Sequence, residues 1–305
     1  MGPRLDESFR WTRRRWLFAG SAACAAALRV RGAEEALAAV ADPRPTLSVS
    51  IDGRGPYRLI ADSAAEGLAL SRGVADELRL PPAAQPTTIV GSTGSAARGA
   101  RLASRVDSGD LHWHDVRATI LDRHALATAD GIIGLASLRG LIARYRLSTR
   151  SAEVKARDVA KNGIRLPMTL RRGVVPSIDL QWRDHDGGRH EIVALIDTGA
   201  QMSVGNDALA RLAGAAPSDG YRRTRPLTGS SGETAIGFDA PIQGLRVGAV
   251  EWPRHVIAFA ALSAFRDAAL ASVPALLLGV DLLSRFDEIS IDSDGRVARA
   301  LPRQS

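Results

Sequence analysis

After residue 45 the chain carries one pattern twice, and this internal repeat constrains its fold more than any other feature. Each copy begins with two strand-like segments joined by a Gly-rich turn, predicted at 47–51 and 57–61 and again at 177–182 and 190–196. Both hairpins run directly into an aspartate, Asp62 or Asp197, and these two residues are 135 positions apart. The repeat indicates two copies of one lobe.

Four further landmarks follow each aspartate in the same order, which is hard to obtain by chance. They are a helix-like stretch containing Leu78 or Leu212, a loop bracketed by Gly91 and Gly94 or by Gly229 and Gly232, an apolar pair before Gly134 or Gly279, and a closing strand pair at 145–154 or 286–297. Residues 155–167 contain an Asn-Gly turn and a proline, so they are predicted to connect the two copies.

The residues around the two aspartates have the chemistry of a paired-acid site. The turns are Asp62-Ser63-Ala64-Ala65 and Asp197-Thr198-Gly199-Ala200. Hydrolysis of an amide needs a nucleophilic water and a proton donor for the departing amine. Two carboxylates about 3 Å apart cannot both ionise cheaply, so they share one proton and can supply both functions. We expect the hydroxyl residue to brace each turn, and the small residue after it to bring a backbone N–H to the carboxylate.

On these residues the chain resembles the bacterial retropepsin-like and pepsin-like aspartic peptidases in their fused, single-chain form. The resemblance covers residues 46–302 and implies an all-β fold with short helices, in which two homologous β-barrel-like lobes, 46–157 and 164–302, surround a central cleft. The implied roles are catalysis by Asp62 and Asp197, support of the active-site turns by Ser63, Ala64, Thr198 and Gly199, flaps at Gly91, Gly94, Gly229 and Gly232, and packing under the turns by Gly134 and Gly279. The implied protein is a monomer that hydrolyses peptide or protein substrates without a cofactor or metal.

Ala64 is the main departure, because the resembled family has glycine at that position. Alanine keeps the backbone N–H but adds a methyl group, and it would be strained by about 1–3 kcal/mol if the turn needed positive φ. Two hypotheses therefore stay open: an aspartic endopeptidase, and a catalytically degenerate exported peptide-binding protein with the same fold. Pairing of the second lobe with its copy in another chain is disfavoured, because the fused first lobe would occupy that interface.

The N-terminal segment is typical of an export signal. The stretch 12–17, Thr-Arg-Arg-Arg-Trp-Leu, precedes an apolar run to Leu28, and 36–38 form a small-x-small cleavage site, so 1–38 are predicted to be a twin-arginine-like signal peptide. The apolar run is shorter than the roughly 20 residues that a membrane-spanning helix needs. We expect a periplasmic or secreted protein without an integral membrane segment after cleavage. A lipid tether at Cys24 and a disordered basic tail are the alternatives.

Composition and the remaining motifs argue against other classes. The formal net charge is +7, but no basic run is interleaved with aromatic residues, so no nucleic-acid partner is expected. The single cysteine excludes an internal disulfide and a thiolate zinc site. His112, His114 and Asp115, with His124 nearby, fit a solvated strand face better than a metal site. Neither Gly-bracketed loop matches a phosphate loop or a serine-hydrolase elbow.

Three other aspartates are given structural roles. Asp281, just beyond the second apolar-Gly segment, is predicted to be a helix cap or a surface group rather than a third catalytic acid. Asp179 and Asp292 lie in alternating strands and are predicted to face solvent.

Overall fold

The structure is a computed structural model that describes residues 42–122, 125–136, 138, 140–156, 162–218 and 220–303. The proposed signal segment, Cys24 and His124 lie outside these residues. The described chain is mainly β, as the sequence predicts. Within the described ranges, no helix is both long and apolar enough to span a bilayer. We call residues 42–156 the first lobe and residues 162–303 the second lobe.

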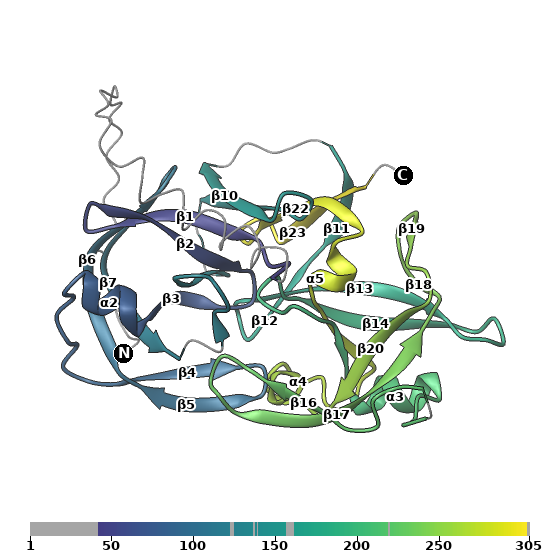
Figure 1. Cartoon of the computed structure of the whole chain (residues 1–305). Coiled ribbons are helices and arrows are strands. Elements are labelled where there is room, and N and C mark those ends of the chain that lie inside the picture. The colour runs from purple at the N-terminus through teal and green to yellow at the C-terminus, as the bar shows by residue number, and fades with distance from the viewer. Residues whose placement is uncertain are drawn as a thin grey trace, which may run out of the picture. The chain divides into compact units, whose positions relative to one another are not determined.

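The first lobe is a closed barrel (Figure 1). Its strands are β1 (Thr46–Ile51), β2 (Arg54–Asp62), β3 (Glu66–Ser71), β6 (Ala100–Ser108), β7 (Leu111–Leu121) and β8 (Gly131–Leu135). They pair in the order β1-β2-β8-β3-β7-β6, and β6 pairs again with β1 to close the ring. Successive side chains of a strand point to opposite faces, and this explains the apolar interior of the barrel. Every second residue of β1 is buried, namely Leu47, Val49 and Ile51, while the residues between them are more exposed.

The second lobe repeats this strand order, but the two ends of its sheet do not pair with each other in the described residues. Its main strands are β13 (Val175–Arg183), β14 (Arg189–Ile196), β15 (Val204–Gly205), β17 (Thr234–Ile242), β20 (His255–Ala260) and β21 (Ala275–Leu278). The order β13-β14-β21-β15-β20-β17 matches that of the first lobe. The short strands β12 (Thr169–Arg171), β18 (Leu245–Val247) and β19 (Val250–Glu251) lie at its β13 end. In the described residues β13 pairs with β18 and not with β17, so the sheet of the second lobe is not closed into a ring.

The helices of the described chain are all short. They are α2 (Arg72–Glu77), α3 (Asp207–Ala213), α4 (Ser263–Asp267) and α5 (Val280–Leu283). Helices α2 and α3 each follow the strand after the Asp turn, and each begins with a side-chain cap. Ser71 Oγ accepts a hydrogen bond from the N–H of Val74, and Asn206 Oδ1 accepts one from the N–H of Leu209. Gly214 ends α3 in the left-handed conformation.

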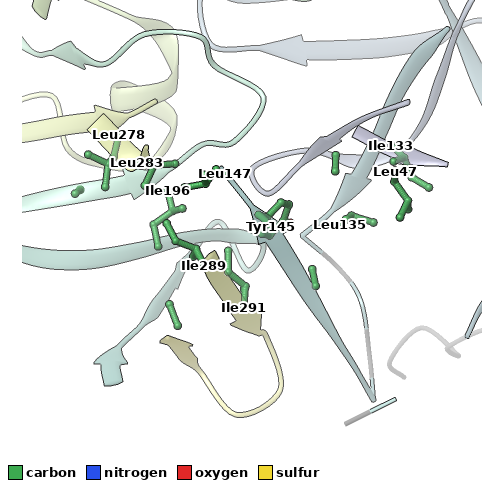
Figure 2. Packing of buried hydrophobic residues seen from close by; sticks show 14 of the residues in the cluster. Leu47, Ile133, Leu135, Tyr145, Leu147, Ile196, Leu278, Leu283, Ile289 and Ile291 are labelled. Atoms are coloured by element: carbon green, nitrogen blue, oxygen red, sulfur yellow. The ribbon is translucent and has the colours of Figure 1, made fainter. Parts of the chain in front are cut away.

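The two lobes are joined by the strand pairs that close each copy. These are β9 (Leu141–Arg146) with β10 (Ser151–Ala156), and β22 (Phe286–Asp292) with β23 (Val297–Pro302). Strand β9 pairs antiparallel with β22, and β11 (Ile164–Pro167), from the predicted connector, pairs with β23. Tyr145 of β9 lies opposite Ile289 of β22 and is completely buried (Figure 2). One continuous apolar core therefore runs through both lobes.

Gly134 and Gly279 lie where one segment of backbone crosses closely over another. A Cβ at Gly134 would overlap the backbone of Ala65, and one at Gly279 would come 2.5 Å from the carbonyl carbon of Met202. Both contacted segments lie just after an Asp turn. Only glycine leaves room for this approach, as the repeated apolar-Gly pattern indicates.

We expect Gly279→Ala to destabilise the fold by about 2–4 kcal/mol or more, because the new methyl meets backbone that cannot move aside. The matched control is Gly73→Ala in α2, where an added Cβ meets nothing within 4 Å. That control should be neutral or stabilising by up to about 1 kcal/mol. Chemical denaturation of both variants measures the difference, and equal stability would contradict the close crossing.

Candidate active site

The two Asp turns meet at the ends of equivalent strands. Asp62 is the last residue of β2, and Asp197 directly follows β14. Strand β2 lies parallel to β8, and β14 lies parallel to β21, so both aspartates are held over the buried apolar-Gly strands. The N–H of Asp197 also donates to the carbonyl of Leu278, at 3.1 Å.

Ser63 and Thr198 bind the two turns to each other reciprocally. The N–H of Ser63 donates to Thr198 Oγ1 and the N–H of Thr198 donates to Ser63 Oγ, both at 3.0 Å. Each hydroxyl then donates across the interface, Ser63 to the carbonyl of Ile196 at 2.8 Å and Thr198 to that of Ala61 at 2.7 Å. The sequence predicted that these hydroxyls brace a turn, and the structure shows that each braces the turn of the other lobe. Because both side chains are buried, these bonds also satisfy groups that water cannot reach.

Backbone N–H groups hold each carboxylate from within its own turn. Asp62 Oδ1 accepts from the N–H of Ala64 at 2.8 Å, and Asp197 Oδ1 accepts from those of Gly199 and Ala200, each at 2.9 Å. These bonds orient the carboxylates and stabilise their ionised forms.

Burial and mutual repulsion oppose ionisation of the pair. Burial raises the pKa of Asp62, against the hydrogen bond from Ala64 and the positive charge of Arg44. Burial and the negative charge of Asp62 raise the pKa of Asp197 to about 8. At neutral pH the protonated form of Asp197 is therefore favoured.

Ala64 is compatible with its turn, but it makes the surroundings of the two active-site aspartates unequal. Neither Ala64 nor Gly199 is among the described residues with positive φ, so alanine meets no left-handed strain here. The Asp62 carboxyl packs against the Cα of Gly199 so closely that a Cβ there would overlap Asp62 Oδ2. In the first lobe the residue equivalent to Gly199 is Ala64, which carries a methyl group where Gly199 has none. The two carboxylates therefore do not have mirror-image surroundings.

The turns form the base of a cleft with a volume of about 390 Å³. Asp62, Asp197, Ala64 and Gly199 line it from below, and Thr93 and Gly229 line it from the flaps. The volume lies within the range of about 300–1,000 Å³ that is usual for ligand sites.

Two hairpins close over the cleft at the predicted flap positions. The first flap is β4 (Thr87–Gly91) with β5 (Gly94–Arg98), and the second is β16 (Arg225–Thr228) with the paired start of β17. Thr93 Oγ1 donates to the carbonyl of Glu233 at 2.6 Å and accepts from the N–H of Gly229 at 3.1 Å. The carbonyl of Ser92 accepts from Ser263 Oγ, at the start of α4, at 3.0 Å.

The flap glycines lie at this contact between the tips. A Cβ at Gly91 would come 3.0 Å from Ser230 Oγ, one at Gly94 would come 2.9 Å from the Glu233 side chain, and one at Gly229 would come 2.5 Å from Thr93 Oγ1. Gly232 has a positive φ of 87°, which turns the second tip. The glycine pattern marks the tips of both hairpins, but no sequence signal identified the groups that join them, which are the Thr93 hydroxyl and Arg98, whose Nη2 donates to the carbonyl of Ser231.

The other ionisable groups singled out in the sequence are engaged elsewhere. His112 lies on β7 and hydrogen-bonds Asp107 at 2.7 Å, and His114 is exposed. Among the described residues, no group of three or more His, Cys, Asp or Glu side chains is placed to hold a metal. Asp115 has a positive φ of 52° on β7.

The structure places the three remaining aspartates in different environments. Asp179 is exposed, as predicted, whereas Asp292 is half-buried and accepts from the N–H of Gly295. Asp281 lies in the first turn of α5, where its Oδ1 accepts from the N–H of Leu282 at 2.8 Å and from the buried Ser203 Oγ at 2.6 Å, so it binds the start of the helix and does not line the cleft. Gly279, not Asp281, is the residue that precedes α5.

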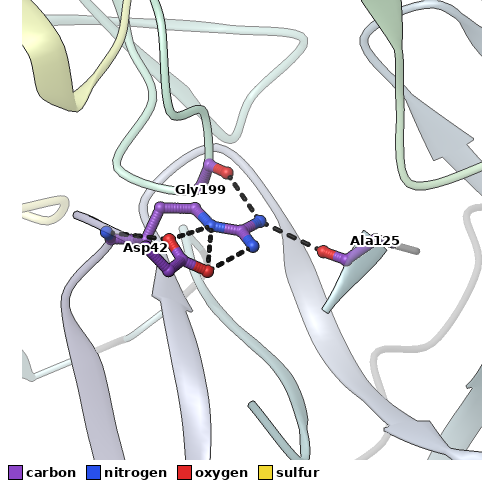
Figure 3. A network of polar contacts seen from close by, with 4 residues as sticks. Asp42, Ala125 and Gly199 are labelled. Carbon is purple, nitrogen blue, oxygen red and sulfur yellow. Dashed lines mark hydrogen bonds and ion pairs between the residues drawn. The ribbon is translucent and has the colours of Figure 1, made fainter. Parts of the chain in front are cut away.

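Arg44 is a cleft residue that the sequence analysis did not identify. It precedes β1, lines the cleft and is only 9% exposed. Its guanidinium binds Asp42 and two carbonyl groups from different lobes (Figure 3). No motif marks it, since apart from the neighbouring Asp42 its partners are backbone carbonyl groups distant in sequence.

The inequality of the turns is testable with a reciprocal pair of variants. Gly199→Ala should displace the Asp62 carboxyl and destabilise the fold by about 1–3 kcal/mol, because the methyl overlaps that group. Ala64→Gly should fold with a stability within about 1 kcal/mol of the parent, since it only removes a methyl group. Thermal unfolding at one fixed pH compares them. Similar losses in both variants would contradict the described asymmetry.

The raised pKa of Asp197 should make the fold less stable as pH rises. Between the ordinary aspartate pKa of 3.8 and the raised pKa of about 8, the unfolded chain releases this proton while the folded chain keeps it, so the free energy of unfolding falls with increasing pH. Asp197→Asn removes this dependence and should gain about 1–3 kcal/mol over the parent from pH 4 to pH 8, allowing for screening by cleft water. Denaturation at several pH values measures the gain, and a constant difference would refute the raised pKa.

Comparison with known proteins agrees with the geometry of the first lobe. Residues 47–136 match a family model described as aspartyl protease. The matched segment runs from β1 to the end of β8 and contains the Asp62 turn, Ala64 included. No match to a curated protein was found for the chain. The first barrel is therefore similar to the aspartyl proteases, which supports aspartic-type protease activity for this chain.

Proposed function

We propose that the chain is an aspartic endopeptidase in which one active site is built from both lobes. The observation that carries the proposal is the joining of the two Asp turns by the reciprocal Ser63 and Thr198 hydrogen bonds, at the base of a flap-covered cleft. This arrangement holds two acids in rigid turns with backbone N–H groups directed at them. Paired acids of this kind are suited to activate water and protonate a leaving group in turn.

In the proposed reaction the pair begins with one shared proton. The ionised carboxylate accepts a proton from the attacking water, while the neutral partner donates its proton to the oxygen of the scissile carbonyl. On collapse of the tetrahedral intermediate, the carboxyl that took the proton from water gives it to the departing amine, and a hydroxyl of the intermediate returns a proton to the other carboxylate as the new carbonyl forms. The raised pKa of Asp197, about 8, favours it as the initial donor and Asp62 as the initial base. The pair still titrates as a unit.

The cleft has features suited to an extended peptide. Leu195, Val204, Leu262 and Leu277 give its second-lobe wall an apolar surface. The flaps lie over the carboxylates and would exclude bulk water once substrate is bound. Separation of the flap tips requires loss of the two Thr93 hydrogen bonds and of the bond from Arg98 Nη2 to the carbonyl of Ser231, at about 1 kcal/mol for each neutral bond and somewhat more for the charged donor.

A catalytically degenerate peptide-binding protein is the second candidate, and the methyl group of Ala64 is the observation that favours it. That methyl group occupies the space which, on the opposite side, admits a carboxyl. If it separates the acids, the cleft would bind peptides without cleaving them. A peptide analogue with a statine-type hydroxyl distinguishes the candidates, because tight binding without turnover of a peptide library would favour the binding protein.

The endopeptidase proposal predicts that Asp62→Asn and Asp197→Asn each lower kcat/KM by about 1,000-fold or more, since an amide cannot share or transfer the proton. Both variants should keep the parent fold by circular dichroism. Asp179→Asn, an exposed acid on β13, is the matched control and should retain activity. Cleavage of a peptide library is the measurement, with activity expected to fall towards alkaline pH as the pair loses its proton. Substantial activity in either active-site variant would refute the shared-proton mechanism.

A further inference from the structure

Arg44 is a buried cation placed between the two lobes. It lies in the segment Asp-Pro-Arg-Pro that leads into β1, and its side chain is 9% exposed. A buried guanidinium needs compensation for its lost hydration, and here the compensation is specific. Arg44 Nε and Nη2 donate to the carboxylate of Asp42 at 2.9 and 2.7 Å, in the two-pronged geometry that only arginine provides.

The remaining terminal nitrogen of Arg44 connects the lobes. Nη1 donates to the carbonyl of Ala125 in the first lobe at 3.1 Å and to the carbonyl of Gly199 in the second lobe at 3.3 Å (Figure 3). Gly199 is the turn residue whose N–H binds Asp197 and whose Cα packs against the Asp62 carboxyl. Arg44 therefore holds a residue that touches both acids.

We propose that Arg44 is a positioning residue for the acid pair, which fixes the Asp197 turn through the carbonyl of Gly199 and keeps one carboxylate ionised by its fixed positive charge. This role rests on the proposed peptidase function, since it concerns the same site. It deepens that function, because it assigns the pair a permanent counter-charge outside the two Asp turns.

The charges around the cleft support this assignment. Arg44 lowers the pKa of both Asp62 and Asp197, against the larger effect of burial. Burial alone would raise the pKa of Asp42, but its hydrogen bonds with Arg44 outweigh that effect and lower it, so the partner stays ionised. The nearby phenol of Tyr145 stays neutral, because burial raises its pKa well above 10.

The other charged side chains that line the cleft are paired further from the acids. Arg172 binds Asp267 at 3.1 Å at a half-exposed position, and Arg225 binds Asp239 at 2.7 Å. Neither Arg172 nor Arg225 is among the groups that shift the pKa of Asp62 or Asp197. Arg172 is therefore a suitable control cation, since it shares the cleft without the same effect on the pair.

The test compares Arg44→Met, Arg44→Lys and Arg172→Met by pH–rate profiles for peptide cleavage. Loss of the Arg44 charge lets the second proton bind at higher pH, so the acid limb of Arg44→Met should move upward. At the pH where the parent has half its maximal rate, that variant should lose about threefold or more relative to its own plateau. Arg44→Lys should keep the parent's acid limb while its kcat falls, because it retains the charge but not the planar fork. Arg172→Met should leave the limb unchanged.

A purely structural role for Arg44 gives a different result. Both Arg44 variants would then lose stability and rate with the acid limb unmoved, which would overturn the proposal. A shift of the acid limb to higher pH in Arg172→Met would also overturn the proposal, because any positive charge in the cleft would then have the same effect as Arg44.

A second readout does not depend on turnover. Infrared titration of the carboxyl C=O band, taken as the difference between each protein and its Asp197→Asn form, follows protonation of the pair directly. An upward shift in Arg44→Met supports the role of Arg44 even if no peptide is cleaved, in which case the peptidase proposal fails alone. Peptide cleavage with no shift in either readout would refute the role of Arg44 and leave the peptidase proposal standing.

Discussion

The reciprocal hydrogen bonds between Ser63 and Thr198 are the constraint on which the site depends. They lie directly beside Asp62 and Asp197, and each crosses from one lobe to the other. Because both hydroxyls are buried, separating the lobes would leave donors and acceptors without partners. The relative position of the two aspartates is therefore set by hydrogen bonds between the lobes that are costly to break.

Around this joint the protein maintains an arrangement that is electrostatically unfavourable in itself. Two carboxyl groups are withdrawn from water and placed where each raises the cost of ionising the other. Backbone N–H groups and Arg44 offset part of that cost, while the continuous core beneath, with Tyr145 at its centre, supplies the rigidity. Stability that the site removes is restored by packing elsewhere, which is common where acids are used in chemistry.

The repeated pattern predicted the elements that depend on local sequence. Both Asp turns, both flaps and the close crossings at Gly134 and Gly279 follow from residue types at fixed spacing, because hairpins, turns and glycine contacts leave local marks. The partners of Ser63 and Thr198 could not be assigned, since a hydroxyl can bind within its own turn or across an interface. No sequence pattern predicted Arg44 at the cleft either, because apart from Asp42 its partners are carbonyl groups 81 and 155 residues away.

The antiparallel pairing of β9 with β22 has a consequence for how such a chain can diverge. Each strand belongs to the closing pair of its own copy, so the contact is of the kind that two identical subunits make across a twofold axis. In an assembly of identical subunits, every substitution enters the site twice. A covalently joined pair is free of that restriction, and the difference between the alanine at position 64 and the glycine at position 199 is one that two identical subunits could not carry.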